Sequence, residues 1–202
     1  MWGGMGRPKS FNQDEAVEIA LNKFWELGYG ACSVNTLSEA MGITRSSFYN
    51  AFGTREALFA RAIDRYLEMV PTRALDLPSE YDVPTLLTET LREVCRTRGE
   101  ASTAGKGCAV VNSIVELGGF QDPVGRKMAG LILGAVEQIE MLLDQAKADG
   151  DLHEDADTRA MALTLQTMIV GLNVMCKLKP GKDMLWSIAQ TNLEALGLFR
   201  EV

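Results

Sequence analysis

The chain has 202 residues, of which 47% are hydrophobic and 23% charged, and its formal net charge at pH 7 is −7. This composition predicts a globular protein with room for one large domain or two smaller ones, and the acidic balance argues against a broadly basic nucleic-acid coat. No uninterrupted apolar run reaches the roughly 18 residues that a membrane span needs, and the start lacks a signal peptide's apolar stretch, so a cytoplasmic protein is expected.

The cysteines and the histidine give no sign of a disulfide framework or a metal site. Cys32, Cys95, Cys108 and Cys176 are widely spaced, and in a cytoplasmic protein they are expected to be reduced thiols. His153 is the single histidine and lies in a polar stretch without a second imidazole, so a zinc site built by the protein is not expected. No metal and no other cofactor is predicted.

The first predicted helix runs over about residues 13–27. Asn12 and Glu15 form a capping pair at its start. The inner stripe of this helix comprises Val17, Ala20, Leu21 and Phe24. Gly28 and Gly30 then end the helix.

Residues 33–58 have the pattern of two short helices that are joined at a glycine and followed by a third helix. Ser33 is a suitable N-cap for the first helix, in which Leu37 and its apolar neighbours recur at helical intervals. Gly42 supplies the left-handed or otherwise permissive backbone that a sharp turn requires. Thr44 is a suitable N-cap for the second helix, whose Phe48 faces inward. Together these features predict a helix-turn-helix.

The outward face of the second short helix is polar and basic. Arg45, Ser46, Ser47 and Asn50 lie on it, and such side chains suit the base edges and phosphates of DNA. Residues 1–60 carry five Lys or Arg and six Asp or Glu, so most of the net negative charge lies in the rest of the chain. A locally basic surface on an acidic protein indicates a specific DNA-binding regulator.

The rest of the chain is also predicted to be helical. Thr54 can cap a fourth helix that continues to Pro71 and joins two domains, and residues 71–84, with three prolines, are predicted to form a linker or long loop. Further helices are expected over about residues 85–98, 108–117, 123–148, 156–178 and 182–198. The predicted fold is all-α with about nine helices: an N-terminal three-helix helix-turn-helix domain over residues 1–55 and a helical-bundle ligand-binding and dimerisation domain over residues 56–202.

With these motifs the chain resembles the TetR family of one-component bacterial transcriptional regulators. The resemblance is carried by Gly6-Arg7-Pro8, Phe11, Ala20, Gly28-Tyr29, Ser33-Val34, Leu37, Ala40, Gly42, Ser47-Phe48-Tyr49, Phe52-Gly53, Arg55-Glu56 and Leu58. Arg55 stands where most members carry lysine, and either cation can meet a phosphate. Residues 107–112 and 116–117 also resemble one subgroup of the family, in which a Gly-Cys pair begins a helix of the ligand domain.

The resemblance implies a ligand-responsive repressor that a small molecule or electrophile releases from a palindromic, double-stranded DNA operator. The residues expected at DNA are Arg7, Lys9, Ser33, Thr44, Arg45, Ser46, Ser47, Tyr49, Asn50 and Arg55. Arg45 and Asn50 are expected at bases or the phosphates beside them, whereas Tyr49 and Arg55 are expected at phosphates. For the N-terminal arm that carries Arg7 and Lys9, a solvated tail is the alternative interpretation.

The last two predicted helices are apolar over more than one face, which is typical of a helix in a core or an interface. The resemblance implies that they pair with their copies in a four-helix interface of a homodimer. The residues expected in this interface are Met168, Leu172, Met175, Leu185, Ile188 and Leu193.

Four residues of the second domain are candidates for binding or sensing a small-molecule effector: Cys108, Asn112, Gln166 and Lys177. Cys108 begins a helix beside Lys106, so the helix dipole and the ammonium group both favour the reactive thiolate; the alternative is an inert buried cysteine. Asn112 and Gln166 are polar residues within apolar stretches. Lys177 either approaches the same cavity or extends into solvent.

The alternative function is a helical small-molecule-binding protein or enzyme with an incidental helix-turn-helix-like pair. An enzyme needs converging acid, base or nucleophilic groups. The sequence offers one histidine, no nucleophile elbow and no phosphate-binding glycine motif, so no catalytic activity is predicted.

Overall fold

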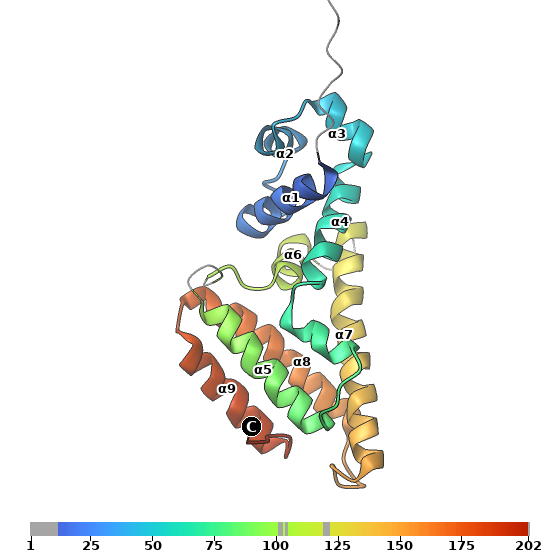
Figure 1. Cartoon of the computed structure of the whole chain (residues 1–202), viewed down its shortest axis with the longest axis vertical. Helices are drawn as coiled ribbons and strands as arrows, with labels where there is room; N and C mark the ends of the chain where they lie inside the picture. Colours follow the sequence, from blue (N-terminus) through green and yellow to red (C-terminus); the bar gives the residue numbers. More distant parts are fainter. Residues whose placement is uncertain (1–11, 101–102, 104, 119–121, 202) are drawn as a thin grey trace, which may run out of the picture. The chain divides into compact units, whose positions relative to one another are not determined.

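The computed structural model describes residues 12–100, 103, 105–118 and 122–201, and these residues form helices and connecting segments without a β-strand (Figure 1). The α-helices are α1 (Gln13–Leu27), α2 (Val34–Met41), α3 (Arg45–Phe52), α4 (Arg55–Leu67), α5 (Val83–Gly99), α6 (Ala109–Leu117), α7 (Pro123–Asp149), α8 (Thr158–Met175) and α9 (Lys182–Ala195). Two 3-10 helices, η1 (Pro71–Asp76) and η2 (Cys176–Leu178), follow α4 and α8. The predicted all-α class is confirmed.

Contacts within the chain define two compact units, residues 1–65 and 66–202. The division falls near the end of α4, whereas the sequence predicted a boundary between residues 55 and 56, at the start of this helix. Phe59 of α4 accounts for the difference, because its ring centroid lies 4.9 Å from the ring centroids of both Phe24 and Tyr29. Most of α4 thus packs with the helix-turn-helix, and only its last residues belong to the second unit.

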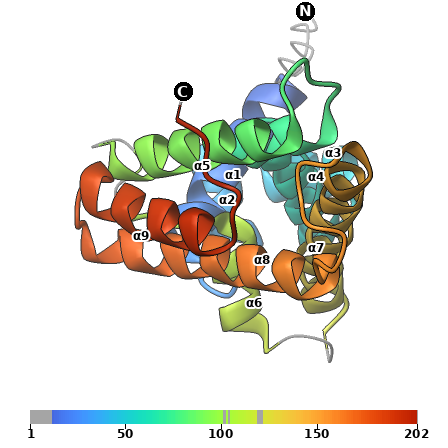
Figure 2. The same cartoon turned by 90° about the horizontal axis from the view of Figure 1, so that it is seen from below.

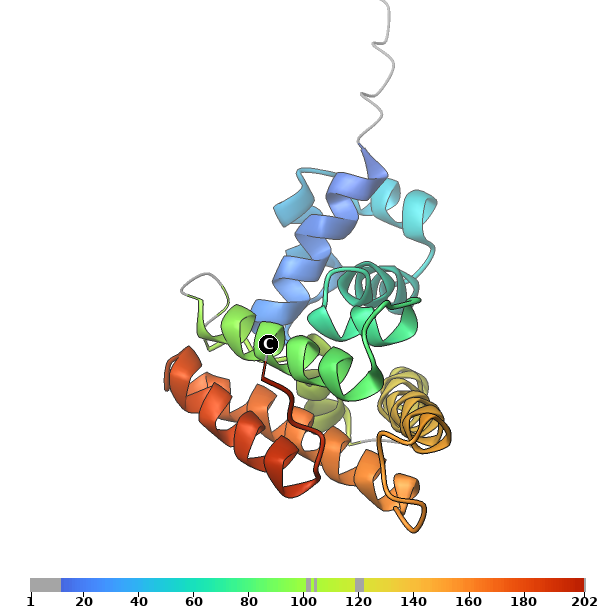
Figure 3. The ribbon, with the colours of Figure 1, turned by 60° about the horizontal axis from the view of Figure 1, so that its bottom comes forward.

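The helix starts of the N-terminal unit are fixed by local capping bonds, as the sequence predicts. The side chains of Asn12, Ser33 and Thr54 each accept a hydrogen bond from a backbone N–H in the following helix at 2.9–3.1 Å. Gly42 ends α2 in the left-handed region, with φ of 66°. The predicted helix-turn-helix is therefore confirmed, and α2 packs against both α1 and α3 (Figure 3).

The C-terminal unit is a bundle in which α5 packs along α9, and α7 packs against α8 (Figure 2). Apolar side chains spaced three and four residues apart on each helix face a shared core. Its fully or almost fully buried members include Leu87, Leu91, Ile139, Leu143, Leu165, Leu172, Leu185 and Leu193.

The segment predicted as a linker is partly helical. η1 begins at Pro71, and its residue Leu75 is buried in the bundle core. α5 begins at Val83, with Pro84 in its first turn, where a missing N–H breaks no helical hydrogen bond. The prolines thus mark a short helix and a helix start, and only residues 77–82 remain as a connection.

Residues 158–178, which comprise α8 and η2, are long and apolar enough to cross a membrane by length and composition alone. Polar residues such as Gln166 interrupt this segment, in line with the lack of an uninterrupted apolar run. Leu165, Ile169 and Leu172 of the same helix are buried in the bundle core. The position of α8 inside the bundle therefore accounts for its apolar composition.

Candidate nucleic-acid interface and effector site

The helix α3 begins in a network of small hydroxyl groups. Thr44 is its N-cap, and the Oγ1 atom of Thr44 accepts a hydrogen bond from the backbone N–H of Ser47 at 3.1 Å. The same oxygen lies 2.9 Å from the Ser46 hydroxyl and 3.0 Å from the Ser47 hydroxyl. The remaining first-turn amides and these hydroxyls can donate to a phosphate, because the helix N-terminus carries partial positive charge.

The two faces of α3 differ as the sequence predicts. Phe48 and Phe52 are buried, with ring centroids 5.5 Å apart. Arg45, Tyr49 and Asn50 are exposed on the other side of the helix, and Ser46 lies beside them. The exposed side chains combine one cation with several hydrogen-bonding groups. Such groups contact the phosphates and the base edges of a DNA groove.

Arg55 has contacts inside the N-terminal unit. Its guanidinium carbon lies 4.0 Å from the centroid of the Tyr29 ring, and its Nη1 donates to the carbonyl oxygens of Tyr29 and Cys32 at 3.3 and 3.5 Å. These contacts join the start of α4 to the connection between α1 and α2. They favour a structural role for Arg55, and its predicted phosphate contact stays a prediction.

The hydroxyl of Tyr29 donates to the Oε1 atom of Glu56 at 2.9 Å in the same corner. Burial, together with this bond, raises the pKa of Tyr29. Hydrogen bonds from its own backbone N–H and from Tyr29 lower the pKa of Glu56. The carboxylate form of Glu56 is therefore the form that holds Tyr29.

Three of the four predicted effector residues meet around Gly107. Gly107 has φ of 70°, and a Cβ added there would lie 3.0 Å from Cε of Lys177 and 3.2 Å from Oδ1 of Asn112. Cys108 follows directly as the N-cap of α6, with a partly exposed side chain, and Nδ2 of Asn112 donates to the carbonyl of Lys106 at 2.8 Å. Asn112 thus braces the loop that presents Cys108.

Gln166 and Lys177 differ in their surroundings. Gln166 is buried on α8, about two turns before Asn173. The exposed Lys177 lies in η2, with its aliphatic stem over Gly107. Both placements are compatible with contact to a ligand, and their roles stay predictions.

A buried polar cluster that sequence reasoning missed lies beside Cys108. Arg98 of α5 donates from Nε to Oδ1 of Asn173 at 2.7 Å and from Nη2 to the hydroxyl of Tyr66 at 2.8 Å. These three side chains are only 5%, 5% and 2% exposed. The spacing of α5 could have indicated that Arg98 is buried, because Arg98 follows Leu91 and Cys95 at helical intervals on the inner face of this helix.

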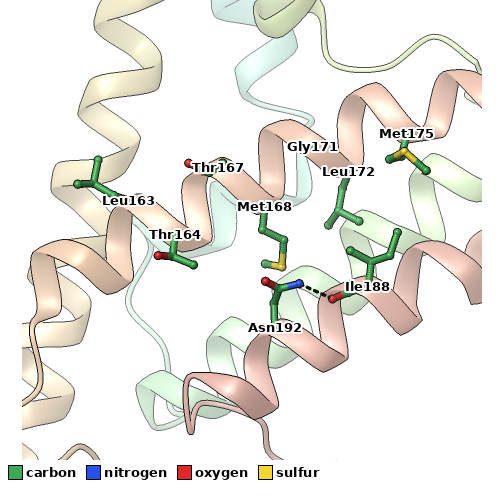
Figure 4. Close-up of a pocket in the computed structure, with 9 residues that line it drawn as sticks. All are labelled: Leu163, Thr164, Thr167, Met168, Gly171, Leu172, Met175, Ile188 and Asn192. Atoms are coloured by element: carbon green, nitrogen blue, oxygen red, sulfur yellow. Dashed lines mark hydrogen bonds between the residues drawn. The ribbon is translucent and has the colours of Figure 1, made fainter.

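The predicted interface residues lie in two places, the bundle core and a groove between α8 and α9. Leu185 and Leu193 are completely buried within a single chain, and the predicted interface stays a prediction. Four others line a groove of about 440 Å³ between α8 and α9: Met168, Leu172, Met175 and Ile188. Figure 4 shows the side chains of Met168 and Ile188 directed toward this groove.

Two family models match the chain. The model described as "Tetracyclin repressor-like, C-terminal domain" matches residues 88–190, more than half of the chain, and the model "Bacterial regulatory proteins, tetR family" matches residues 17–62. The chain belongs to the TetR family. It is a DNA-binding transcriptional regulator, and its family is one of regulators rather than of enzymes.

Relatives of this TetR-family protein cover almost all of it. The HTH-type transcriptional repressor ComR of Escherichia coli (strain K12) is 26% identical over 93% of this chain and 90% of its own length. The uncharacterized regulator YezE of Bacillus subtilis (strain 168) is 28% identical over 95% of this chain and 100% of its own length.

A solved structure extends the comparison to DNA. A cysteine-substituted variant of the TetR family transcriptional regulator CifR, complexed with 26 bp double-strand operator DNA, is 29% identical to this chain. The similarity covers 94% of this chain and 99% of CifR, with a TM-score of 0.80. The fold of this TetR-family protein therefore matches, over nearly its full length, one that has been seen on an operator.

Proposed function

We propose that this regulator is a repressor that binds a palindromic operator as a homodimer and leaves it when a small molecule or electrophile occupies the second unit. The observation that carries the proposal is the geometry of α2, Gly42 and α3, which presents an exposed polar and basic helix face. The operator complex of CifR and the repressor ComR support it. Two symmetric recognition helices require half-sites about 34 to 36 Å, or a multiple, apart.

The proposed DNA contacts follow the exposure of the residues on and around α3. Arg45 and Asn50 would contact bases or neighbouring phosphates, while the hydroxyls of Thr44, Ser46 and Ser47 and the ring of Tyr49 would lie against the backbone. Ser33 would act at the start of α2. Arg7 and Lys9, proposed for the minor groove or the backbone, lie outside the described residues.

The proposed dimer uses the groove between α8 and α9. Exposed apolar side chains on these two helices include Leu163, which lines the groove, and Met184 of α9. An apolar groove beside further exposed apolar side chains is stabilised when a second copy removes both from water. Pairing of α8 and α9 with their copies would form the four-helix interface.

The proposed effector site is the loop around Gly107, with Cys108 as its reactive group. Cys108 is partly exposed, whereas Cys32, Cys95 and Cys176 are buried, so an electrophile from solvent reaches Cys108 first. The sulfur would form a bond to an electrophilic carbon as that carbon's π bond or its bond to a leaving group breaks, and the thiol proton would pass to solvent. No catalytic turnover is proposed, and the cytoplasm is the proposed location.

A gel-shift assay with the DNA upstream of the protein's own coding region tests operator binding. A shifted band that unrelated DNA does not compete away is expected, and no shift with any upstream fragment would contradict the proposal.

The sensing step is tested by treating wild type, Cys108→Ser and Cys32→Ser with an electrophile or peroxide and measuring operator release. Wild type and Cys32→Ser are expected to release DNA, and Cys108→Ser to retain it. Equal release by Cys108→Ser would favour a noncovalent effector instead.

A further inference from the structure

The ends of four helices meet at the buried polar cluster beside Cys108. Tyr66 belongs to the last turn of α4, Arg98 to the last turn of α5, and Asn173 to the last turn of α8, while Cys108 is the N-cap of α6. Each of the first three side chains is more than nine-tenths buried. The hydrogen bonds of this polar cluster therefore link the ends of α4, α5 and α8.

Several contacts fix the cluster in place. Arg98 bridges Asn173 and Tyr66 with hydrogen bonds of 2.7 and 2.8 Å. Nδ2 of Asn173 donates to the carbonyl of Ile169 at 2.8 Å, which holds its Oδ1 toward Arg98. A Cβ on Gly107 would lie 2.9 Å from the carbonyl oxygen of Asn173, so this glycine lets the loop that carries Cys108 approach α8 closely.

The hydroxyl of Tyr66 lies in this cluster, and the cluster lies against the loop that carries Cys108. The Tyr66 oxygen accepts the Nη2–H of Arg98 at 2.8 Å, and its own O–H can donate. Arg98 also holds Asn173, whose carbonyl oxygen would lie 2.9 Å from a Cβ on Gly107, the residue before Cys108. Burial raises the pKa of Tyr66, so the hydroxyl keeps its proton at neutral pH.

We propose that the hydroxyl of Tyr66 donates to the Cys108 sulfur and thereby couples the chemical state of Cys108 to α4. This inference rests on the proposed sensing role of Cys108 and names the residue that passes the signal on. Because α4 begins in the N-terminal unit and ends with Tyr66 and Leu67 in the C-terminal unit, a change at Tyr66 acts on a helix that both units share.

The physical reason is the burial of the Tyr66 hydroxyl. Tyr66 is 2% exposed, and a group bonded to the sulfur changes the acceptor that this hydroxyl meets. A buried hydroxyl without its acceptor is unfavourable, so the ring and the end of α4 shift to a different packing. The reduced thiol thus stabilises the packing that binds the operator.

The test compares operator affinity before and after alkylation in wild type, Tyr66→Phe, Cys108→Ala and the double variant. Iodoacetamide is the probe: the sulfur–carbon bond forms, iodide leaves, the thiol proton passes to buffer, and mass spectrometry counts the modified Cys108. Phenylalanine keeps the buried ring and removes only the hydroxyl. Tyr81→Phe, at an exposed tyrosine of the same unit, is the matched control.

Unmodified Tyr66→Phe and Cys108→Ala are each expected to bind the operator at least about 5-fold more weakly than wild type, a typical allosteric coupling, and the double variant no more weakly than either. Alkylation at Cys108 should weaken wild type and Tyr81→Phe but add little in Tyr66→Phe. A Tyr66→Phe protein that binds and releases DNA like wild type overturns the coupling alone. A fully alkylated wild type that keeps its affinity overturns the sensing role as well.

Discussion

Arg45 is the first residue of α3 and Arg55 is the first residue of α4, yet their surroundings differ. Arg45 is exposed at the start of α3, whereas Arg55 lies over the Tyr29 ring and donates to two backbone carbonyls. A guanidinium already bound to backbone oxygens has fewer donors left for DNA. The two arginines are therefore expected to respond differently to substitution.

Replacing Arg45 with alanine is expected to weaken operator binding without changing thermal stability. If Arg45 reads a guanine, the loss is about 1 to 3 kcal/mol and specificity relaxes at one base pair. Binding to operators mutated at single positions measures this. An equal loss on every sequence would show a phosphate contact only.

Replacing Arg55 with lysine is expected to destabilise the N-terminal unit by about 1 kcal/mol, because an ammonium group lacks the planar fork that stacks on Tyr29 and reaches two carbonyls. Thermal unfolding measures the loss. Weaker operator binding with an unchanged unfolding temperature would instead show that Arg55 acts on phosphate.

The carboxyl group of Glu56 is expected to make the stability of the N-terminal unit depend on pH. Its folded-state pKa lies below the ordinary value of 4.5, so its contribution is present above that pH and is lost as the pH falls through the lowered value. Wild type should thus be more stable than Glu56→Gln at pH 7, and the difference should shrink in acid. Unfolding curves at several pH values check this, and a difference that does not change with pH would contradict it.

At the scale of the element, the turn between α2 and α3 depends on backbone conformation alone. Gly42 has φ of 66°, and a Cβ there would meet no atom within 4 Å. Gly42→Ala is therefore expected to cost about 1 to 2 kcal/mol through the left-handed backbone rather than through a clash.

Gly130 supplies a matched control for that experiment. It lies exposed inside α7, and a Cβ there would also meet no atom within 4 Å. Gly130→Ala is expected to stabilise the protein by about 0.5 to 1 kcal/mol, because alanine suits a helix interior better. Denaturant unfolding compares the two variants, and equal effects would contradict the role of the Gly42 backbone.

At the scale of the whole molecule, the groove between α8 and α9 gives a test of the dimer that leaves the core intact. Gly171 lines the groove, and a Cβ there would meet no atom within 4 Å. Gly171→Glu should yield folded monomers that bind the operator weakly, since dimerisation would bury an unpaired charge. Leu172 is a poorer site for this test, because it is buried within one chain and a charge there would also unfold the bundle.

Gly134→Glu, at an exposed glycine of α7, is the control for Gly171→Glu. It should remain a dimer with normal operator binding. Analytical ultracentrifugation distinguishes the states, and a dimeric Gly171→Glu protein would place the interface elsewhere.

Local sequence signals determined the elements of the N-terminal unit. Asn12, Ser33 and Thr44 were predicted as N-caps and Gly42 as a left-handed turn, and the structure confirms all four. A cap or a turn depends on atoms a few residues apart in the chain, so the residues that form it can be read in order. The order of the helices in the bundle followed from the same kind of signal.

Only the tertiary structure decided which side chains from distant segments meet. The sequence could not show that Arg55 reaches Tyr29, that a single chain buries Leu185, or that Arg98 joins Tyr66 to Asn173. Each of these contacts depends on how helices far apart in the chain pack, and periodicity gives only the face of a helix that turns inward, not the partner that it meets. The sequence by itself thus determined a helical DNA-binding regulator and its elements, whereas packing decided the surroundings of Cys108.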